Sequence, residues 1–259
     1  MTREQMPMLI AVAGTLILLT LEKTWPAAQG RARVTRHAGR NLSLGLLNGI
    51  VLALLAAPLL IVAAGWAEER NFGLLRLASF PSAVATILGL MLFDGWMYLW
   101  HRANHEIGFL WRFHRVHHND PEMDVTTAMR FHLGEMVIST LLRLLVIPLL
   151  GLNLGQLLLY ETLLFPVILF HHSNVRFPER LDRRLRALIV TPAIHRIHHS
   201  EVRAETDSNY SSVFSFWDRI AGTFRLRPDG RPVDFGLAEY SDDYWQRLRG
   251  MMLLPFSRK

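Results

Sequence analysis

The sequence predicts an all-α integral membrane protein, with about four to five membrane-embedded helices and a helical, histidine-rich cap. Three observations support this prediction. Of the 259 residues, 51% are hydrophobic and only 19% are charged, whereas a globular domain carries roughly 25% charged residues. The hydrophobic residues stand in long blocks instead of the stripes of amphipathic helices. Eleven of the 12 histidines follow residue 100, near the ends of these blocks.

Five apolar blocks correspond to the expected membrane helices. They are residues 8–21, 42–66, 80–100, 136–152 and 154–170. A helix that crosses a bilayer needs about 20 apolar residues, so the second and third blocks are predicted to be spans. The first block is shorter, but its flanks lack the positive region and the cleavage pattern of a signal peptide. We expect the last two blocks to form a hairpin that enters the membrane and returns.

Arg143, inside the fourth apolar block, is costly in a membrane. An arginine at the centre of a bilayer costs about 2.5–3.5 kcal/mol on insertion scales. We therefore expect Arg143 to face protein or an aqueous cavity. A soluble helical protein is the alternative, but it would have to bury two apolar blocks of this length in one small domain.

The distribution of lysine and arginine predicts the orientation. The segment between the first two blocks carries Lys23 and four arginines, whereas the segment between the second and third carries only Arg70 and Arg76. Because cytoplasmic loops hold the excess of Lys and Arg, the first segment is predicted to be cytoplasmic and the second external. This predicts a multi-pass protein of the cell (inner) membrane, with the histidine-rich part and the C-terminal part in the cytoplasm.

The composition also limits the possible sites and partners. The chain has no cysteine, which excludes disulfides, thiolate zinc sites, cysteine-bound iron–sulfur clusters and cysteine nucleophiles. The net charge of +6 is compatible with a membrane surface, and we expect no nucleic-acid partner.

We expect one domain over residues 1–259, with N-terminal spans (1–79), a histidine-box region (80–224) and a tail (225–259). The tail contains Tyr244, Trp245, Leu248 and Met252. This pattern fits either a helix on the membrane surface or one packed on the cytoplasmic part.

Eight histidines form three short clusters with the spacing of metal ligands. They are His101-Arg102-Ala103-Asn104-His105, His114-Arg115-Val116-His117-His118 and His195-Arg196-Ile197-His198-His199. Positions i, i+3 and i+4 of a helix share one face, so H-x-x-x-H aims two imidazoles at one point and H-x-x-H-H aims three. Neutral imidazole binds iron, zinc, copper or nickel, and eight histidines suggest two metals. A solvent-exposed pH sensor is the alternative.

Helix signals surround these clusters. Thr191-Pro192 is a candidate N-cap and first helical residue for the third cluster, and Asn119-Asp120-Pro121 ends the helix of the second. Asp94 and Tyr98 continue the stripe of His101 and His105 towards the N-terminus. Asp94 is therefore a candidate acceptor for the second ring N–H of a histidine ligand. The alternative is a capping or solvated aspartate near a helix end.

Two further segments add candidate ligands. Arg130-Phe131-His132-Leu133-Gly134-Glu135 precedes the fourth block, and Phe170-His171-His172-Ser173-Asn174 ends the fifth, so the hairpin returns both to the side of the clusters. We expect His132 to bind metal rather than to stand at a helix terminus. Of His171 and His172, one is expected to bind metal. His37 lies in a basic loop and is expected at the surface.

Taken in order, these motifs resemble the fatty acid hydroxylase superfamily, and within it the sterol desaturase branch. The resemblance runs from about Asp94 to Thr223. It consists of D-x-x-x-Y-x-W-H-R-x-x-H (94–105), L-W-x-F-H-x-V-H-H (110–118), T-A-x-R-x-H (127–132), F-x-H-S-N (170–174), T-P-x-x-H-x-x-H-H (191–199), Asn209-Tyr210 and a closing stretch (217–223). Leu133 stands where the family commonly has Pro, and Ser211 where it often has Gly. Neither departure removes a candidate ligand.

The resemblance implies an integral membrane, non-haem di-iron enzyme that uses O2 and external electrons to hydroxylate or desaturate a lipid. The metal centre itself would be the catalytic group, with two iron ions and no further bound cofactor. His172 takes the family's position in F-x-H-S-N, whereas His171 stands where another polar residue is usual. The expected ligands are His101, His105, His114, His117, His118, His132, His172, His195, His198 and His199, and the expected supporting residues are Asp94, Tyr98, Glu135 and Asn174.

Electrons are expected from a separate protein. The chain has no nucleotide-binding glycine fingerprint, haem motif or iron–sulfur ligand set, so a ferredoxin or cytochrome b5-like protein with an NAD(P)H-dependent reductase is implied. A basic face suits an acidic carrier, although the ordinary cytoplasmic excess of positive charge is the simpler explanation. Its members are Arg180, Arg183, Arg184, Arg186, Arg196 and Arg203.

Two other functions fit part of the pattern. A metal-dependent membrane hydrolase is disfavoured because no H-E-x-x-H motif occurs. A non-enzymatic membrane metal-binding protein predicts an exchangeable ion and no substrate channel. The sequence leaves open whether the lipid is a sterol, hopanoid, carotenoid, fatty acyl or ether lipid. It also leaves open the choice between hydroxylation and desaturation, the metal identity and the oligomeric state.

Overall fold

The computed structural model describes residues 6–28, 34–227 and 233–257, and within these ranges it contains helices and loops but no β-strand. Four segments are long and apolar enough to cross a membrane: Thr35–Arg76, Ser82–Glu106, Leu133–Leu150 and Leu154–His172. The predicted all-α membrane fold is confirmed.

Long helices come first along the chain and short ones follow. The long helices are α1 (Met6–Thr24), α2 (Val34–Val51), α3 (Ala57–Glu69), α4 (Ser82–Glu106), α5 (Gly108–His118), α6 (Leu133–Leu150) and α7 (Leu154–His172). The short ones are α8 (Glu179–Leu185), α9 (Pro192–His198), α10 (Arg203–Thr206), α11 (Phe216–Ile220) and α12 (Leu248–Leu253). A π-helical turn, η2 (Leu52–Ala56), joins α2 to α3, and the 3-10 turns are η3 (Leu74–Arg76), η4 (Val125–Met129), η5 (Ala238–Tyr240), η6 (Asp243–Gln246) and η7 (Leu254–Phe256).

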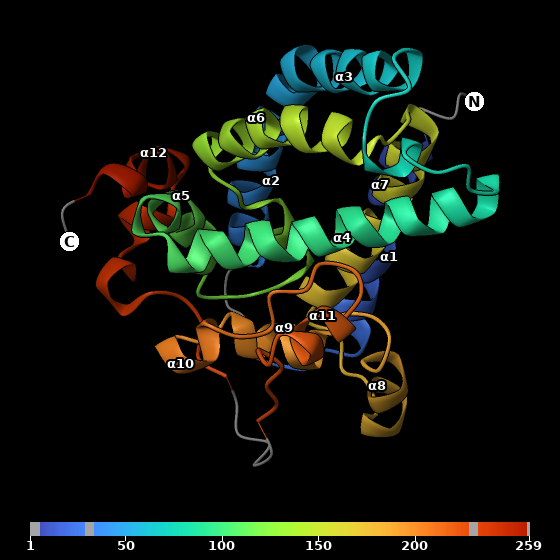
Figure 1. Cartoon of the computed structure of the whole chain (residues 1–259). Helices are drawn as coiled ribbons and strands as arrows, with labels where there is room; N and C mark the ends of the chain where they lie inside the picture. Colours follow the sequence, from blue (N-terminus) through green and yellow to red (C-terminus); the bar gives the residue numbers. More distant parts are fainter. Residues whose placement is uncertain (1–5, 29–33, 228–232, 258–259) are drawn as a thin grey trace.

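The second apolar block is bent rather than straight. α2 continues through η2 into α3, and Pro58 stands in the first turn of α3. Proline removes one helical hydrogen bond and clashes with the preceding turn, and a π-helical turn accommodates such a break. As a result α3 turns away from α2 and packs along α6 (Figure 1).

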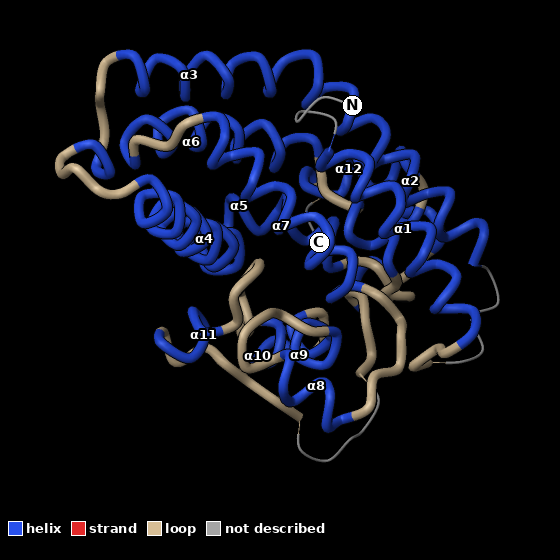
Figure 2. Tube along the Cα trace, turned by 90° about the vertical axis from the view of Figure 1, so that its right-hand side faces the viewer, coloured by secondary structure: helices blue, strands red, loops and turns tan. Residues whose placement is uncertain are grey.

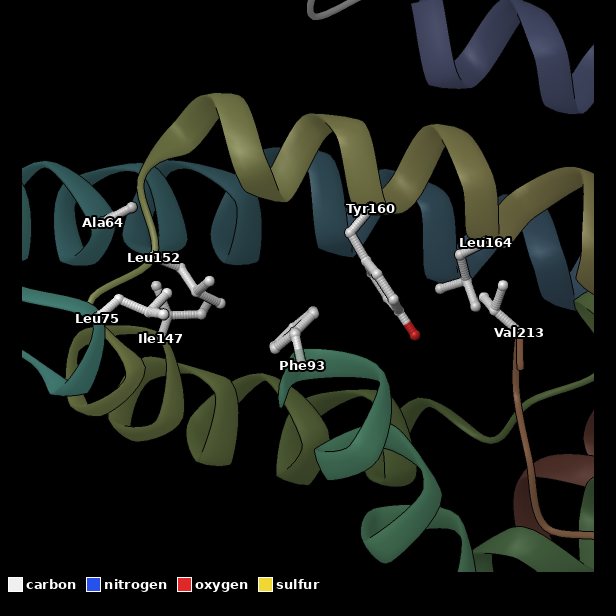
Figure 3. Packing of buried hydrophobic residues seen from close by; sticks show 8 residues of the cluster. All are labelled: Ala64, Leu75, Phe93, Ile147, Leu152, Tyr160, Leu164 and Val213. Carbon is white, nitrogen blue, oxygen red and sulfur yellow. The ribbon is translucent and has the colours of Figure 1, made fainter. Parts of the chain in front are cut away.

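The two short apolar blocks form helices α6 and α7, joined by a tight turn. Gly151 ends α6 at φ +77°, a left-handed conformation that favours glycine. Gly73, at φ +113°, packs directly against this turn, because a Cβ there would lie 2.3 Å from the backbone nitrogen of Gly151. Beyond the turn α4 packs against both α6 and α7, and Phe93 of α4 meets the ring of Tyr160 edge-on at 4.9 Å (Figure 3).

A charged pair lies between the membrane helices. Arg143 of α6 donates to Oε1 of Glu161 in α7 at 3.0 Å, and its guanidinium carbon lies 5.6 Å from the ring centroid of Phe93. Arg143 therefore faces protein, as the sequence predicted, and the paired carboxylate reduces the cost of placing its charge in an apolar medium.

The short helices α8–α11 gather on one side of α4, opposite α3 and α6 (Figures 1 and 2). We call residues 173–227, which contain these helices, the cap. α9 packs against α7 and α10 against α9, so the cap sits on the membrane helices at the end that carries histidines. Val213 of the cap reaches into the core beside Leu164 of α7 (Figure 3).

The tail packs on protein. Met251 of α12 and Leu254 of η7 are fully buried against Leu44 of α2 and Val116 of α5. Of the two alternatives for this segment, the structure therefore shows the helix packed on the rest of the chain.

Candidate metal centre

Nine histidines come together in two neighbouring groups. The five-histidine group consists of His101 and His105 from α4, His114 and His118 from α5, and His198 from α9. The four-histidine group consists of His117 from α5, His172 from α7, and His195 and His199 from α9 and its C-cap. Within each group the ring nitrogens that could bind a metal all lie within 4.8 Å of one another. The two groups adjoin, because the rings of His118 and His199 stack at 4.5 Å.

Each H-x-x-H-H box contributes to both groups. His114 and His118 belong to the five-histidine group, whereas His117 between them belongs to the other. Helical residues four apart differ by only about 40° in direction, but neighbours differ by about 100°. The i, i+4 pair is therefore the chelating unit, and the expectation that all three imidazoles of a box aim at one point is wrong.

Backbone and carboxylate acceptors orient three rings of the five-histidine group. Nδ1 of His101 donates to the Tyr210 carbonyl at 2.8 Å, and Nδ1 of His198 donates to the Ser208 carbonyl at 2.7 Å. Nδ1 of His114 donates to Oε1 of Glu135 at 2.9 Å. An imidazole that donates from Nδ1 keeps a lone pair on Nε2, which is the arrangement of a metal ligand held by a second partner.

Four of the five Nε2 atoms of this group are buried without partners among the described residues. Those of His105, His114, His118 and His198 make no hydrogen bond within the described structure. Leaving a buried polar atom unpaired costs about 1–3 kcal/mol, so four such atoms within one group call for a partner that the described residues do not supply. A metal ion would provide it.

The four-histidine group has the spacing of adjacent metal ligands. Nδ1 of His172 donates to the Ile168 carbonyl, and its Nε2 lies 3.1 Å from Nε2 of His117 and 3.0 Å from Nε2 of His195. Metal–imidazole bonds of about 2.1 Å place neighbouring ligand nitrogens about 3.0 Å apart when they meet at right angles. The donors present therefore fit a transition-metal ion.

The cap and α5 histidines are expected to be neutral at physiological pH. Burial, reinforced by neighbouring imidazoles, holds the pKa of His117, His118, His195 and His199 well below the usual range and lowers the pKa of His198 to about 3. Neutral rings have the free lone pair that metal binding requires. Because both groups contain only histidine, the donor set suits iron, zinc, copper or nickel better than magnesium or calcium.

His132 does not join either group. It caps the N-terminus of α6, where its Nδ1 accepts from the Gly134 amide at 2.9 Å and its Nε2 donates to the Met252 carbonyl at 3.2 Å. Both ring nitrogens are used, so we leave His132 out of the proposed ligand set. Of the adjacent pair, His172 belongs to the four-histidine group, whereas His171 packs its ring against His195 with centroids 3.9 Å apart.

Of the four expected supporting residues, Glu135 accepts a hydrogen bond from a grouped histidine, His114. Asp94 instead accepts from the Tyr160 hydroxyl, the Trp217 indole and two backbone amides of the cap, so the prediction that it orients a histidine ring directly is wrong. The Tyr98 hydroxyl bonds Oγ1 of Thr223, and Asn174 bonds the backbone of Ala28.

His37 is buried, not exposed, and the prediction of a surface position is wrong. Its side chain lies in the first turn of α2, between the carboxylates of Asp120 and Asp124. The basic residues around it in the sequence suggested a solvated loop, but the helix already begins at Val34. Only the fold brings the segment after the second histidine box against this turn.

Residue types could not indicate the roles of the Ser208 and Tyr210 carbonyls, because every residue has a backbone acceptor. The ring of Phe131, stacked on His117 at 4.3 Å, was also missed, although its place beside His132 could have indicated it.

The geometry agrees with comparisons to known proteins. The family model described as fatty acid hydroxylase matches residues 86–223, more than half of the chain, and this range contains all nine grouped histidines. The chain belongs to the fatty acid hydroxylase family. The resemblance of the histidine boxes to the fatty acid hydroxylase superfamily is thereby confirmed, and in this family member the match begins within α4 and extends beyond α9.

Curated relatives of this family member carry names of lipid-oxidising enzymes. Ornithine lipid hydroxylase OlsE of Rhizobium tropici is 32% identical over 180 residues, which cover 70% of this chain and 53% of the relative. Human alkylglycerol monooxygenase is 30% identical over 54% of this chain and 30% of its own length, and human cholesterol 25-hydroxylase is 26% identical over 52% and 49%. The chain thus spans about half or less of the length of these relatives. No solved structure matches it significantly.

Proposed function

We propose that this protein is a membrane-bound di-iron enzyme that uses O2 and external electrons to hydroxylate or desaturate a lipid. The observation that carries the proposal is the pair of adjoining all-histidine groups at the ends of apolar helices. The names of the relatives support it, because each joins a lipid to a hydroxylase or monooxygenase activity. A pair of redox-active metals fits better than zinc, which has no redox chemistry.

Two irons bound by these groups would supply the O2 activation that an unreactive C–H bond requires. The chain's own contribution is to hold nine imidazoles in place and to fix four of their rings through Glu135 and through the carbonyls of Ser208, Tyr210 and Ile168. Ring orientation by such partners typically changes metal affinity or activity by about 10–100-fold.

Aromatic and apolar side chains keep water from the centre. Trp111 lies 5.1 Å from the ring of His105, and Phe131 covers the ring of His117. The histidines of both groups, apart from the half-buried His101, are buried. Excluding water in this way favours reaction with the substrate over side reactions.

The position of the centre supports a substrate that arrives from the membrane. His101 and His105 occupy the last two turns of α4, and His172 ends α7, so both groups lie at the ends of predicted spans. A lipid could therefore present a carbon to the centre while most of its chain stays in the apolar phase. The Lys and Arg distribution supports placing this end of the helices at the cytoplasmic face.

A separate electron carrier of the ferredoxin or cytochrome b5 type, reduced by NAD(P)H, would complete the reaction. Three arginines of the basic face are engaged within the protein: Arg186 with Asp182, Arg196 with the Ser173 carbonyl and Arg203 with Asp207. The other three, Arg180, Arg183 and Arg184, lie exposed on α8. This patch is the candidate docking site for an acidic carrier.

The test is oxygen incorporation by membranes that contain the protein. Membranes would be supplied with a reductant, a reductase system and 18O2, and their lipids compared by mass spectrometry with membranes that carry His118→Ala. A lipid that gains one 18O atom, or loses two hydrogens, only with the unchanged protein supports the proposal. Incorporation of oxygen from water would instead indicate a hydrolase, and bound metal without any new lipid would indicate a metal-binding protein.

A further inference from the structure

One cap loop orients two ligands of the five-histidine group. Residues 207–215, which we call the orienting loop, join α10 to α11. Its carbonyls at Ser208 and Tyr210 accept the Nδ1–H groups of His198 and His101. The direction of both Nε2 atoms therefore depends on where this loop is held.

Asp94 of α4 anchors the far end of the orienting loop. Its Oδ1 accepts from the Tyr160 hydroxyl at 2.7 Å and from the Val213 amide at 3.3 Å. Its Oδ2 accepts from the Phe214 amide at 3.1 Å and from Trp217 Nε1 at 2.9 Å. Three of these four donors belong to the loop or to α11, and Asp94 is fully buried. An ionised carboxylate suits this place because it only accepts.

A second carboxylate holds the loop on the other side. Oδ1 and Oδ2 of Asp218 accept from the amides of Tyr210 and Ser211 at 2.7 and 3.0 Å. Tyr210 is thus fixed between Asp218 and the segment bound to Asp94. The loop is braced against α4, the same helix that supplies His101 two turns further on.

We infer that Asp94 is a positioning residue for the metal of the five-histidine group, acting through the orienting loop. The inference rests on the proposed function. It adds that the two metal sites should respond differently to a change at Asp94, which the ligand set alone does not predict. In the four-histidine group, the acceptor of His172 is the Ile168 carbonyl, which belongs to α7 itself. Asn209 of the orienting loop also donates to the Ile194 carbonyl of α9 at 3.0 Å, but this bond does not orient an imidazole ring. We therefore expect loss of the Asp94 anchor to affect the metal of the five-histidine group and to spare the other.

The test is Asp94→Asn with Co²⁺ as the probe. Asparagine has nearly the same shape, but its amide group presents N–H to donors that need an acceptor. Purified metal-free protein in nanodiscs would be titrated with Co²⁺ and followed by absorption spectroscopy. We expect one of the two binding events to weaken by about 10–100-fold, the range found for second partners of ligands, while the other stays unchanged.

Variants of single ligands identify which metal is affected. His105→Ala removes a ligand of the five-histidine group, and adding Asp94→Asn to it should leave the remaining Co²⁺ binding unchanged. His199→Ala removes a ligand of the four-histidine group, and adding Asp94→Asn to it should weaken the remaining site. The opposite pattern, or equal loss at both sites, would overturn the inference.

Two conservative variants separate positioning from general stability. Tyr160→Phe removes a donor to Asp94 from the membrane side, whereas Trp217→Phe removes one from the loop side. Both should lower the melting temperature, but only Trp217→Phe should weaken Co²⁺ binding, and this variant carries the test if Asp94→Asn does not fold. Equal metal affinity in both would overturn the inference. Unchanged protein that binds no pair of metals would overturn the proposed function as well.

Discussion

The metal centre and a second buried cluster, around His37, both contain histidine, but they differ in the partners of the imidazole nitrogens. In the His37 cluster (His37, Asn41, Asp120, Asp124 and Arg130), Nε2 of His37 lies 2.6 Å from Asp120 and Nδ1 lies 3.0 Å from Asp124. In the metal centre, several Nε2 atoms have no partner in the described chain. Both clusters are buried, so burial does not distinguish a structural histidine from a metal ligand. The partners of each ring nitrogen do.

The His37 cluster braces the backbone of the second histidine box. Arg130 donates to the carbonyls of Val116 and Asn119, and Asn41 donates to Asp120. Burial raises the pKa of Asp120, but His37 and Arg130 outweigh this effect and hold it well below its usual range. A charged carboxylate therefore remains to bind its donors, and this cluster is complete without a metal.

The largest expected effect comes from removing a ligand. His117→Ala should abolish turnover and reduce the metal content, because it takes one imidazole from the four-histidine group. The matched control is His132→Ala, which should keep both metals and lose about 0.5–2 kcal/mol of stability as a capping residue. Metal analysis and lipid product would be measured on membrane-inserted protein. Full activity in His117→Ala would remove it from the ligand set.

Metal removal should separate the two clusters within one molecule. Chelation leaves the imidazoles of the centre unpaired, so we expect the free energy of unfolding to fall by an amount on the order of several kcal/mol and to recover when iron is added back. Hydrogen exchange should accelerate in α5 and α9 but not in α2 around Asn41. Equal protection of α9 with and without metal would contradict this expectation.

His37→Ala should show the reverse pattern. It leaves the carboxylates of Asp120 and Asp124 buried without their shared partner, which typically costs about 3–5 kcal/mol. The folded fraction should still bind two metals, because His37 contributes to neither group. Thermal unfolding and metal content per folded protein measure the two quantities. A loss of metal without a loss of stability would reverse the roles assigned to the clusters.

The smallest effect is expected at Glu135, where a carboxylate supports a ligand. Glu135→Gln keeps an acceptor for Nδ1 of His114 but removes its charge, so metal affinity should fall by about tenfold. Glu135→Leu removes the acceptor and should cost more. A Co²⁺ titration of the two variants gives the order, and equal affinities would show that Glu135 does not support the site.

Sequence patterns predicted much of the fold and of the ligand set. The apolar blocks correspond to α1–α4, α6 and α7, the three histidine clusters contain eight of the nine grouped histidines, and the segment that ends the fifth block contains the ninth, His172. The partners that the structure shows for His37, Asp94 and His132 differ from the expected ones for one shared reason. Each depends on a segment distant in the chain: residues 120–124 for His37, the cap for Asp94, and the Met252 carbonyl for His132.

Hydrophobicity and helical spacing are local properties, so the order of the amino acids was enough to predict which segments are apolar enough for the membrane and which helices carry clustered imidazoles. The division of the boxes between two groups, the carbonyls that orient the rings and the burial of Asp94 beside the cap became visible only in the folded chain. Those outcomes arise where helices from different parts of the chain meet, and backbone acceptors take part in them without leaving a trace in residue type.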